Sequence, residues 1–209
     1  GGRDDILVYG VHPVEEALAV LGDGPNARGA RLEIARTDRA ADQLRDLAGQ
    51  LGIGVLNTDN AELDERLPGA NHQGVLLHLG PFPYAELADV LEAAAPKERP
   101  RLLVLDQVQD PHNAGALLRS AAAFGYHGVI VPKDRAAQVT GTVVRISAGG
   151  AFHVPIARVT NLARALDAVR EAGFWIYGAA GDDDARDVSE VDWSGPAALV
   201  MGAEGSGLR

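Results

Sequence analysis

Apolar and polar positions along the first 80 residues predict a small α/β domain. One helix is indicated by apolar residues at three- and four-residue spacing, which gathers them on a single helical face: Ala40, Leu44, Leu47, Ala48 and Leu51. Thr37 can cap the beginning of this helix, and Gly52 can cap its end. Pro13 suits the first turn of an earlier helix that ends near Leu21. Short apolar runs predict strands at residues 7–9, 31–35, 53–56 and 74–79.

A second α/β region is predicted from residue 101 onward. Residues 102–105 are continuously apolar, as expected for a parallel strand covered by helices on both faces. Strand and helix patterns then alternate, which predicts an open, doubly wound sheet. The further strands are expected at 128–131, 153–156, 174–178 and 198–201, and the helices at 114–124, 139–148 and 162–172.

Residues 81–100 separate the two regions. They contain four prolines around a short helical pattern at 84–95. Proline-rich segments with few periodic apolar positions commonly connect domains. We therefore interpret residues 81–100 as a linker.

Charge is unevenly distributed, which modifies what the net charge of −10 implies. That total argues against a chain whose whole surface binds nucleic acid. Residues 1–80 carry 13 acids and 7 bases, whereas residues 101–170 carry 4 acids and 8 bases. The second region therefore either offers a local basic surface for phosphates or has an ordinary mixed surface.

Several classes of protein are disfavoured by composition. The chain has no cysteine, which excludes disulfides, thiolate metal sites and thiol nucleophiles. The six histidines show no metal-ligand spacing, and the acidic run at 182–184 is typical of a solvated loop, so no metal site is predicted. No apolar run is long enough to span a membrane, so we expect a soluble, cytoplasmic protein.

A polar loop follows the predicted strand at 102–105 and leads into a helix. Ligands in open α/β sheets bind outside the carboxyl ends of strands, which makes this loop a candidate site. Asn113 can cap the helix, and Arg119 lies off its apolar stripe, so it can face a groove. On this segment alone, an ordinary cap and a solvated arginine remain the alternative.

A glycine-rich loop follows the last predicted strand. Gly202, Gly205 and Gly207 surround a single acid, Glu204, and allow the backbone to approach a ligand or to turn sharply. The spacing differs from the dinucleotide-binding fingerprint, and the Lys-Ser/Thr pair of a P-loop is absent. A structural turn remains the alternative for this loop by itself.

Together, the two loops resemble motifs one and two of the SpoU/TrmH family in the SPOUT methyltransferase superfamily. The matching runs are Asp110-Pro111-His112-Asn113-x-Gly115-x-x-x-Arg119-Ser120 and Val200-Met201-Gly202-x-Glu204-Gly205-x-Gly207. Residues 129–135 and 158–163 resemble the subgroup that modifies a guanosine in 23S ribosomal RNA. Near the N-terminus, Tyr9-Gly10-x-His12 and Asn71-His72-Gln73-Gly74-Val75 resemble the ribosomal-protein-like RNA-binding domain of that subgroup.

The resemblance implies an S-adenosylmethionine-dependent RNA ribose 2'-O-methyltransferase. Its RNA-binding domain would occupy residues 1–80, and an α/β trefoil-knot (SPOUT) domain would occupy residues 101–209 and form a homodimer. The implied catalytic residues are Asn113, Arg119 and Glu204. The implied cofactor-binding residues are Ala179, Ala180, Gly181, Met201, Gly202, Gly205 and Gly207. The implied RNA-binding residues are His12, Asn71, Gln73, Lys133 and Arg135.

The chemistry restricts what Arg119 can do in such a reaction. A guanidinium is effectively always protonated, so it is poorly suited to act as a general base. A contact to a phosphate or to the ribose 2'-oxygen, which stabilises developing negative charge, is physically easier. The 2'-hydroxyl acceptor itself specifies RNA rather than DNA.

The third motif of the family, an apolar strand and a helix that complete the knot, is not present in residues 1–209. Such knots are rare among folds. We expect the natural protein to begin before Gly1 and to continue beyond Arg209, which leaves the knot incomplete in this chain. Two alternatives remain: a tRNA or antibiotic-resistance rRNA methyltransferase of the same family, and a noncatalytic RNA-binding or assembly protein.

Overall fold

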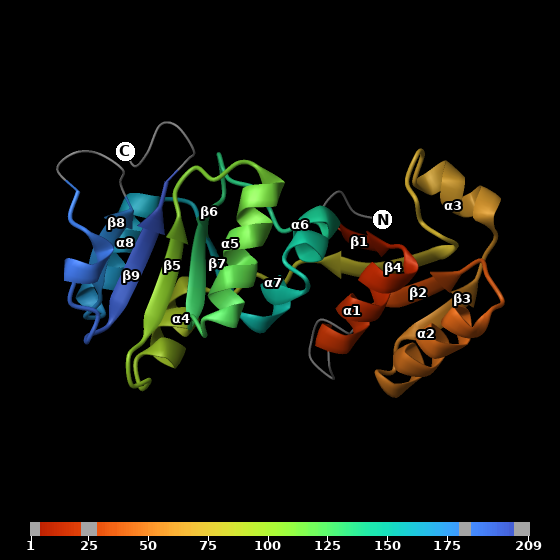
Figure 1. Cartoon of the computed structure of the whole chain (residues 1–209), viewed down its shortest axis with the longest axis horizontal. Coiled ribbons are helices and arrows are strands. Elements are labelled where there is room, and N and C mark those ends of the chain that lie inside the picture. The colour runs from red at the N-terminus through yellow and green to blue at the C-terminus, as the bar shows by residue number, and fades with distance from the viewer. Residues whose placement is uncertain (1–4, 22–28, 180–184, 203–209) are drawn as a thin grey trace. The chain divides into compact units, whose positions relative to one another are not determined.

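The computed structural model describes residues 5–21, 29–179 and 185–202. The chain forms two compact units. The first comprises Gly1–Pro83 with Val139–Phe152, and the second comprises Tyr84–Gln138 with His153–Arg209. Each unit is built on its own β-sheet (Figure 1). Within the described ranges, no helix is both long enough and apolar enough to cross a membrane.

The first unit contains a four-stranded mixed sheet in the order β1-β4-β2-β3. β4 pairs antiparallel with β1 and β2, and β2 pairs parallel with β3. In chain order the elements are β1 (Asp5–Tyr9), α1 (Val11–Leu21), β2 (Arg31–Ile34), α2 (Arg39–Gln50), β3 (Gly54–Asn57), α3 (Asn60–Arg66) and β4 (Val75–Pro81). Leu76 of β4 packs with Leu63 of α3, and its neighbour Leu77 faces the opposite side because strand residues alternate.

The ends of α2 show where the local pattern was right and where it was wrong. Asp38 caps α2, because its carboxylate accepts the amide hydrogen of Ala41 at 3.1 Å; the prediction of Thr37 was off by one residue. Gly52 follows the C-cap residue Leu51 with φ +67, as predicted for a glycine that ends a helix. Helix α3 was not predicted, because this short element buries only Leu63 and shows no apolar period.

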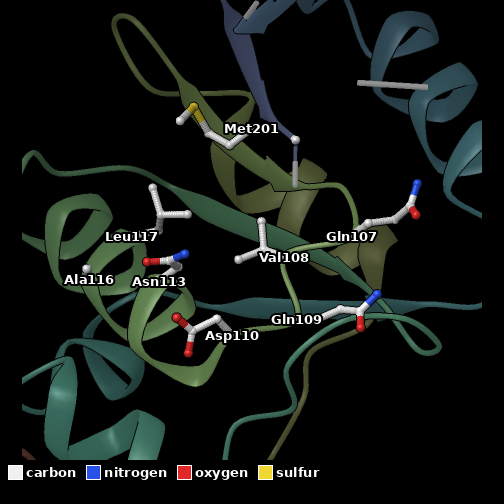
Figure 2. Close-up of a pocket in the computed structure, with 9 residues that line it drawn as sticks. Gln107, Val108, Gln109, Asp110, Asn113, Ala116, Leu117 and Met201 are labelled. Atoms are coloured by element: carbon white, nitrogen blue, oxygen red, sulfur yellow. The ribbon is translucent and has the colours of Figure 1, made fainter. Parts of the chain in front are cut away.

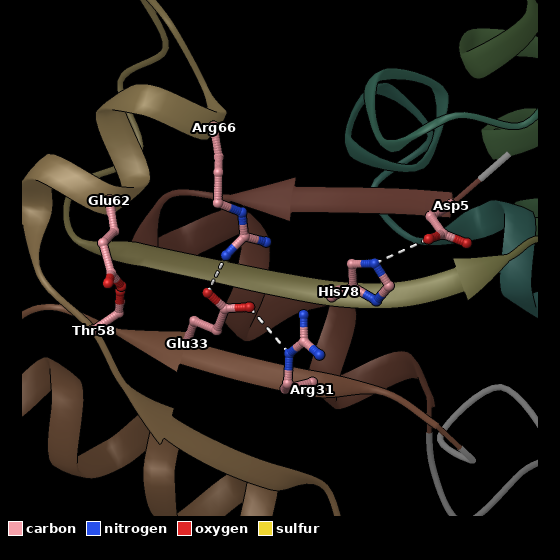
Figure 3. Close-up of polar contacts among 7 residues, drawn as sticks. All are labelled: Asp5, Arg31, Glu33, Thr58, Glu62, Arg66 and His78. Atoms are coloured by element: carbon pink, nitrogen blue, oxygen red, sulfur yellow. Dashed lines mark hydrogen bonds and ion pairs between the residues drawn. The ribbon is translucent and has the colours of Figure 1, made fainter. Parts of the chain in front are cut away.

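A buried acid joins two elements of the first unit. Glu33 lies on β2 between Arg31 of the same strand and Arg66 of α3 (Figure 3). Burial by itself raises the pKa of Glu33, but the hydrogen bonds and charges of the two arginines outweigh it and hold that pKa below its ordinary value. In the same sheet, His78 of β4 pairs with Asp5 of the edge strand β1 at 3.1 Å.

The second unit contains a five-stranded sheet in the order β7-β6-β5-β9-β8, in which all neighbouring strands are parallel. Its main elements are α4 (Leu87–Ala94), β5 (Arg101–Leu105), α5 (Pro111–Ala123), β6 (Gly128–Pro132), β7 (Ile156–Val159), α8 (Leu162–Glu171), β8 (Trp175–Ala179), the short 3-10 helix η2 (Val188–Glu190) and β9 (Ala197–Met201). Helix α5 lies on one face, and α4 and α8 lie on the other (Figure 1). The predicted α/β fold is confirmed.

Two segments differ from the sequence pattern. The strand expected at 153–156 is β7, which begins at Ile156, because Pro155 lacks the amide hydrogen that a sheet ladder requires. The helix expected at 139–148 is α6 (Gly141–Ile146), and it is followed by α7 (Gly150–His153). Residues 139–152, which the pattern assigned to the second region, group with the first unit.

Helix α4 lies within the stretch interpreted above as a linker, and it contributes to the core of the second unit. Val90 and Ala94 are buried among the residues of the sheet. Gly128, at the start of β6, makes this close packing possible: a Cβ atom at that position would lie 2.2 Å from Cγ1 of Val90.

Candidate active site

A pocket of ≈ 600 Å³ opens where β5 and β9 end side by side. The two strands pair up to Leu105 and Met201, and the amide of Asp106 donates to the Met201 carbonyl at 2.8 Å. The chain continues from β5 to β6 on one side, whereas β9 lies on the other, so the loops diverge at this point. The pocket is lined by Gln107, Val108, Gln109, Asp110, Asn113, Ala116, Leu117, Met201 and Gly202 (Figure 2).

The start of α5 places Asn113 in the wall of this pocket. Asp110 caps the helix by accepting the amide hydrogen of His112 at 2.9 Å, so the prediction that Asn113 is the cap was wrong. Pro111 explains the shift, because proline is favoured at the first helical position and the cap residue precedes it. Asn113 is therefore inside the first turn, and Ala116 and Leu117, one turn later, share its face.

Gln107 is a functional candidate that the sequence pattern did not single out. It lines the pocket with a φ of 58°, a left-handed conformation that is uncommon for a residue other than glycine. Such conformations cluster at functional sites, where the surrounding structure maintains them. Figure 2 shows the amides of Gln107 and Gln109 on one side of Val108 and Asn113 on the other. Only the position of the two glutamines after a buried strand could have indicated them.

The other predicted residues are distributed as follows. Met201 and Gly202 line the pocket. Ala179, on the neighbouring strand β8, pairs with Met201. Arg119 is exposed on α5 and does not line the pocket; it lies on a different face of the helix from Asn113. The other predicted catalytic and cofactor-binding residues lie outside the described residues: Ala180, Gly181, Glu204, Gly205 and Gly207.

A basic loop runs beside the pocket. Lys133 and Arg135 are exposed in the segment after β6, and the amide of Ala137 donates to the carbonyl of the pocket residue Val108 at 2.8 Å. Arg135 has a left-handed φ of 57°. The loop therefore holds two cations close to the pocket in a defined backbone conformation.

Gln138 holds this loop in shape with both ends of its side-chain amide. Its Nε2 donates to the carbonyls of Lys133 at 3.1 Å and Ala136 at 3.2 Å. Its Oε1 accepts from the Tyr84 hydroxyl at 3.3 Å and from Arg158 Nη1 at 3.2 Å. The guanidinium of Arg158 also lies 4.4 Å from the centre of the Tyr84 ring, which adds a cation–π contact.

The three residues predicted to bind RNA in the first unit lie near one another. His12 is exposed in the first turn of α1, where its ring nitrogens lie 3.9 Å from Glu15 and 3.1 Å from Glu16. Oε1 of Gln73 accepts the amide hydrogen of Val11 at 2.9 Å, which brings the turn containing Asn71 and Gln73 to the start of the same helix. A second, polar pocket of ≈ 640 Å³ lies at this turn.

The chemistry of the first pocket suits a ligand with apolar and hydrogen-bonding parts. Among the lining residues that the structure describes, Asp110 has the only ionisable side chain, so this part of the wall is neutral to negative and favours a cationic group. Across the described parts of the chain, no group of three His, Cys, Asp or Glu side chains is placed to hold a metal ion.

Comparison with known proteins places both units. Residues 100–209 match the SpoU rRNA Methylase family, and residues 7–85 match the family described as RNA 2'-O ribose methyltransferase substrate binding. A relative from Vibrio cholerae serotype O1, 23S rRNA (guanosine-2'-O-)-methyltransferase RlmB, is 42% identical over 206 residues, which cover 97% of this chain and 81% of the relative.

Solved structures agree with the sequence matches. The AdoMet-bound rRNA methyltransferase from Sinorhizobium meliloti aligns with a TM-score of 0.74 and 26% identity, covering 99% of this chain and 73% of that one. The SpoU methyltransferase AviRb from Streptomyces viridochromogenes in complex with AdoMet aligns with a TM-score of 0.73 and 25% identity, covering 100% of this chain and 79% of that one.

Proposed function

This chain belongs to the SpoU rRNA methylase family, and on that basis we propose that it methylates the ribose 2'-oxygen of a guanosine in 23S ribosomal RNA with S-adenosylmethionine as the donor. The observation that carries this function is the pocket at the ends of β5 and β9, which brings together Asn113, Met201 and Gly202 from the two family motifs. We propose that residues 1–80 bind the RNA and that residues 101–209 catalyse the transfer.

The reaction makes three demands on the protein. When bound, S-adenosylmethionine would supply the methyl group to the 2'-oxygen and leave as S-adenosylhomocysteine, and the proton of the 2'-hydroxyl would pass to solvent. The protein must therefore position the donor, orient the hydroxyl and stabilise the developing negative charge on its oxygen.

The described residues suit the positive charge and the mixed polarity of the donor. The Asp110 carboxylate favours a cation, and apolar contact is offered by Val108, Leu117 and Met201. We assign Ala179, Met201 and Gly202 to the cofactor wall, because Ala179 and Met201 end neighbouring strands, Gly202 follows directly, and small or flexible residues leave room there. The family motifs support the same role for Ala180, Gly181, Gly205 and Gly207.

The acceptor RNA would be held by polar and basic residues around the pocket. The amide of Asn113, which lines the pocket, would orient the ribose together with Glu204, whose role rests on family resemblance. Arg119 would contact a phosphate or the developing oxyanion once RNA is bound, which agrees with its exposed position on α5. Lys133 and Arg135 would contact flanking phosphates beside the pocket. In the first unit, His12, Asn71 and Gln73 would contact the RNA.

The proposed function is tested with labelled S-adenosylmethionine and unmodified ribosomal RNA, followed by digestion and identification of the methylated nucleoside. The expected product is 2'-O-methylguanosine from large-subunit RNA. Transfer to tRNA but not to ribosomal RNA would identify a methyltransferase of the same family that acts on a different RNA. No transfer to either RNA would instead support a noncatalytic RNA-binding or assembly protein.

The role of Arg119 is tested separately. Arg119→Ala should lower methyl transfer by roughly 100-fold or more, the usual effect of removing one group that stabilises a developing oxyanion. Thermal protection by S-adenosylmethionine should persist, because Arg119 lies outside the pocket. Arg164→Ala, at an exposed position on α8, is the matched control. Full activity of Arg119→Ala would refute the assigned role.

Family resemblance also supports a homodimer formed through the second unit and a cytoplasmic location, where ribosomal RNA resides. Two large apolar side chains of this unit, Phe124 and Trp175, are 80% and 70% exposed and are available for an interface. Light scattering of the purified protein would detect a dimer, and a monomer would contradict this part of the proposal.

A further inference from the structure

We infer that the polar pocket of the first unit binds an unpaired nucleobase of the RNA, with a base edge that donates hydrogen bonds, rather than a backbone phosphate. The inference rests on the proposed function only for the nature of the ligand, an RNA. The pocket measures ≈ 640 Å³ and lies between the start of α3 and the turn that precedes β4. Its polar wall includes Arg36, Asp38, Asn60, Asp64, Asn71 and Gln73.

The floor of the pocket is held rigid by a buried histidine. His72 is only 6% exposed. Its Nδ1 accepts the amide hydrogen of Gly74 at 3.0 Å, and its Nε2 lies 2.9 Å from Oδ1 of Asp64. Because Nδ1 acts as an acceptor, the ring is neutral and Nε2 carries the proton that it donates to Asp64. The histidine thus orients the Asp64 carboxylate and contributes no positive charge.

The turn itself is held in an uncommon backbone conformation. Gln73 has a φ of 53°, and two contacts maintain it. Its Oε1 accepts from the amide of Val11 at 2.9 Å, and its carbonyl accepts from Nη1 of Arg36 at 3.0 Å. At Gly74, with φ +71, a Cβ would lie 3.3 Å from Oδ1 of Asn60. A surface turn stabilised in this way has a preformed shape, as expected of a binding site.

The charge of the pocket decides between a phosphate and a base. Among the described residues that line the pocket, Arg36 is the only lysine or arginine, and its guanidinium is engaged by both carboxylate oxygens of Asp38 and by the Gln73 carbonyl. With His72 neutral, Arg36, Asp38 and Asp64 leave a formal charge of −1. A phosphate would meet net repulsion and no uncommitted cation.

A base edge that donates hydrogen bonds finds suitable acceptors in the pocket. The side chain of Asp64 is 71% exposed, so its carboxylate accepts from His72 and still faces solvent. The amides of Asn60 and Asn71 add both donors and acceptors. Proteins read RNA sequence mainly at unpaired bases, through hydrogen bonds to their exposed edges. The lining therefore matches a base that presents N–H groups, such as guanine, adenine or cytosine.

A bound base and a bound phosphate predict opposite changes in RNA affinity for the substitution of Asp64. Asp64→Asn keeps an oxygen that accepts from His72 but removes the negative charge. Glu65→Gln removes the same charge from the neighbouring exposed position of α3, outside the pocket, and is the matched control. Affinity of the full chain for unmodified 23S rRNA and for tRNA would be measured by filter binding at fixed salt.

If a donor-bearing base occupies the pocket, Asp64→Asn should bind the preferred RNA roughly five- to tenfold more weakly than Glu65→Gln, because a charged acceptor becomes a neutral one. Asn71→Ala, which keeps the His72 contacts, should also weaken binding and covers the case in which Asp64→Asn unfolds. Equal affinity of Asp64→Asn and Glu65→Gln, or unchanged binding by Asn71→Ala, would overturn the inference. Tighter binding by Asp64→Asn would indicate a phosphate and also overturn it.

Methyl transfer measured on the same RNA separates this inference from the proposed function. Weaker RNA binding by Asp64→Asn without any methyl transfer in the unmodified chain would support the pocket and refute the enzyme. Methyl transfer with equal binding by Asp64→Asn and Glu65→Gln would support the enzyme and refute the pocket. If the unmodified chain binds neither RNA, the inference is overturned.

Discussion

Replacing Gly128 by alanine tests how closely α4 packs against the sheet of the second unit. The added Cβ would lie 2.2 Å from Cγ1 of Val90 and 3.1 Å from Cδ2 of Leu102. Both neighbours are essentially inaccessible to solvent, so neither can swing into solvent to relieve the overlap. Overpacking of this kind costs about 1–3 kcal/mol of folding free energy.

The sign of the effect should reverse when Val90 is shortened. Val90→Ala alone should destabilise the protein by roughly 1–2 kcal/mol, because it removes buried methyl groups and leaves a small cavity. In that background Gly128→Ala fills part of the cavity and restricts the unfolded chain. It should then be neutral or stabilising by up to about 1 kcal/mol.

Urea unfolding of the four proteins, monitored by circular dichroism, would measure the coupling free energy between the two sites. The second unit must unfold as a resolved transition for the comparison, and cofactor protection would identify it. If Gly128→Ala destabilises by the same amount with valine and with alanine at position 90, the close contact between α4 and β6 does not exist and the reasoning is refuted.

Three further predictions concern the buried acid, the cap of α5 and the basic loop. Glu33→Gln should lower the free energy of unfolding by about 1–2 kcal/mol at neutral pH. Because the folded pKa of Glu33 is lowered, this contribution is full above the unfolded value of about 4.3 and is lost as pH falls through the folded pKa. Urea unfolding at pH 7 and at pH values below about 4 should therefore show that the difference in free energy of unfolding between Glu33→Gln and wild type becomes smaller at acid pH. A difference that stays constant with pH would contradict this prediction. Asp110→Ala should lower the free energy of unfolding by about 1 kcal/mol, and Asp110→Asn by much less, because asparagine also caps helices. Equal shifts in the melting temperature of the two variants would argue against the cap. Gln138→Ala should raise the KM for RNA several-fold with little change in kcat, with Gln50→Ala on α2 as control, and an unchanged KM would show that the amide does not hold the loop.

Local patterns were sufficient wherever neighbouring residues decide the structure. The apolar spacing in residues 40–51 predicted α2, and the continuous apolar run at 102–105 predicted β5. They failed where two residues close together in the sequence compete for one role. Thr37 and Asp38 both suit a cap, and so do Asp110 and Asn113; the choice depends on which backbone amide each side chain reaches.

The candidate site was predicted in part. Motif resemblance indicated Asn113, Met201 and Gly202, and the structure places all three at one pocket. It did not indicate Gln107, because a left-handed conformation at a non-glycine residue leaves no signal in composition. Motif resemblance also indicated Arg119, which is exposed on α5 on a different face of the helix from Asn113.

Local sequence patterns were enough to predict most helices and strands, the parallel α/β character of the second region and the two loops that carry the chemistry, because hydrophobic period and glycine placement act over a few residues. The position of β9 beside β5, the place of α4 in the core and the shared pocket of Asp64, His72 and Arg36 became visible only in the folded chain. These arrangements depend on contacts between residues far apart in the chain, where packing and charge pairing of whole elements, rather than local preference, set the free energy.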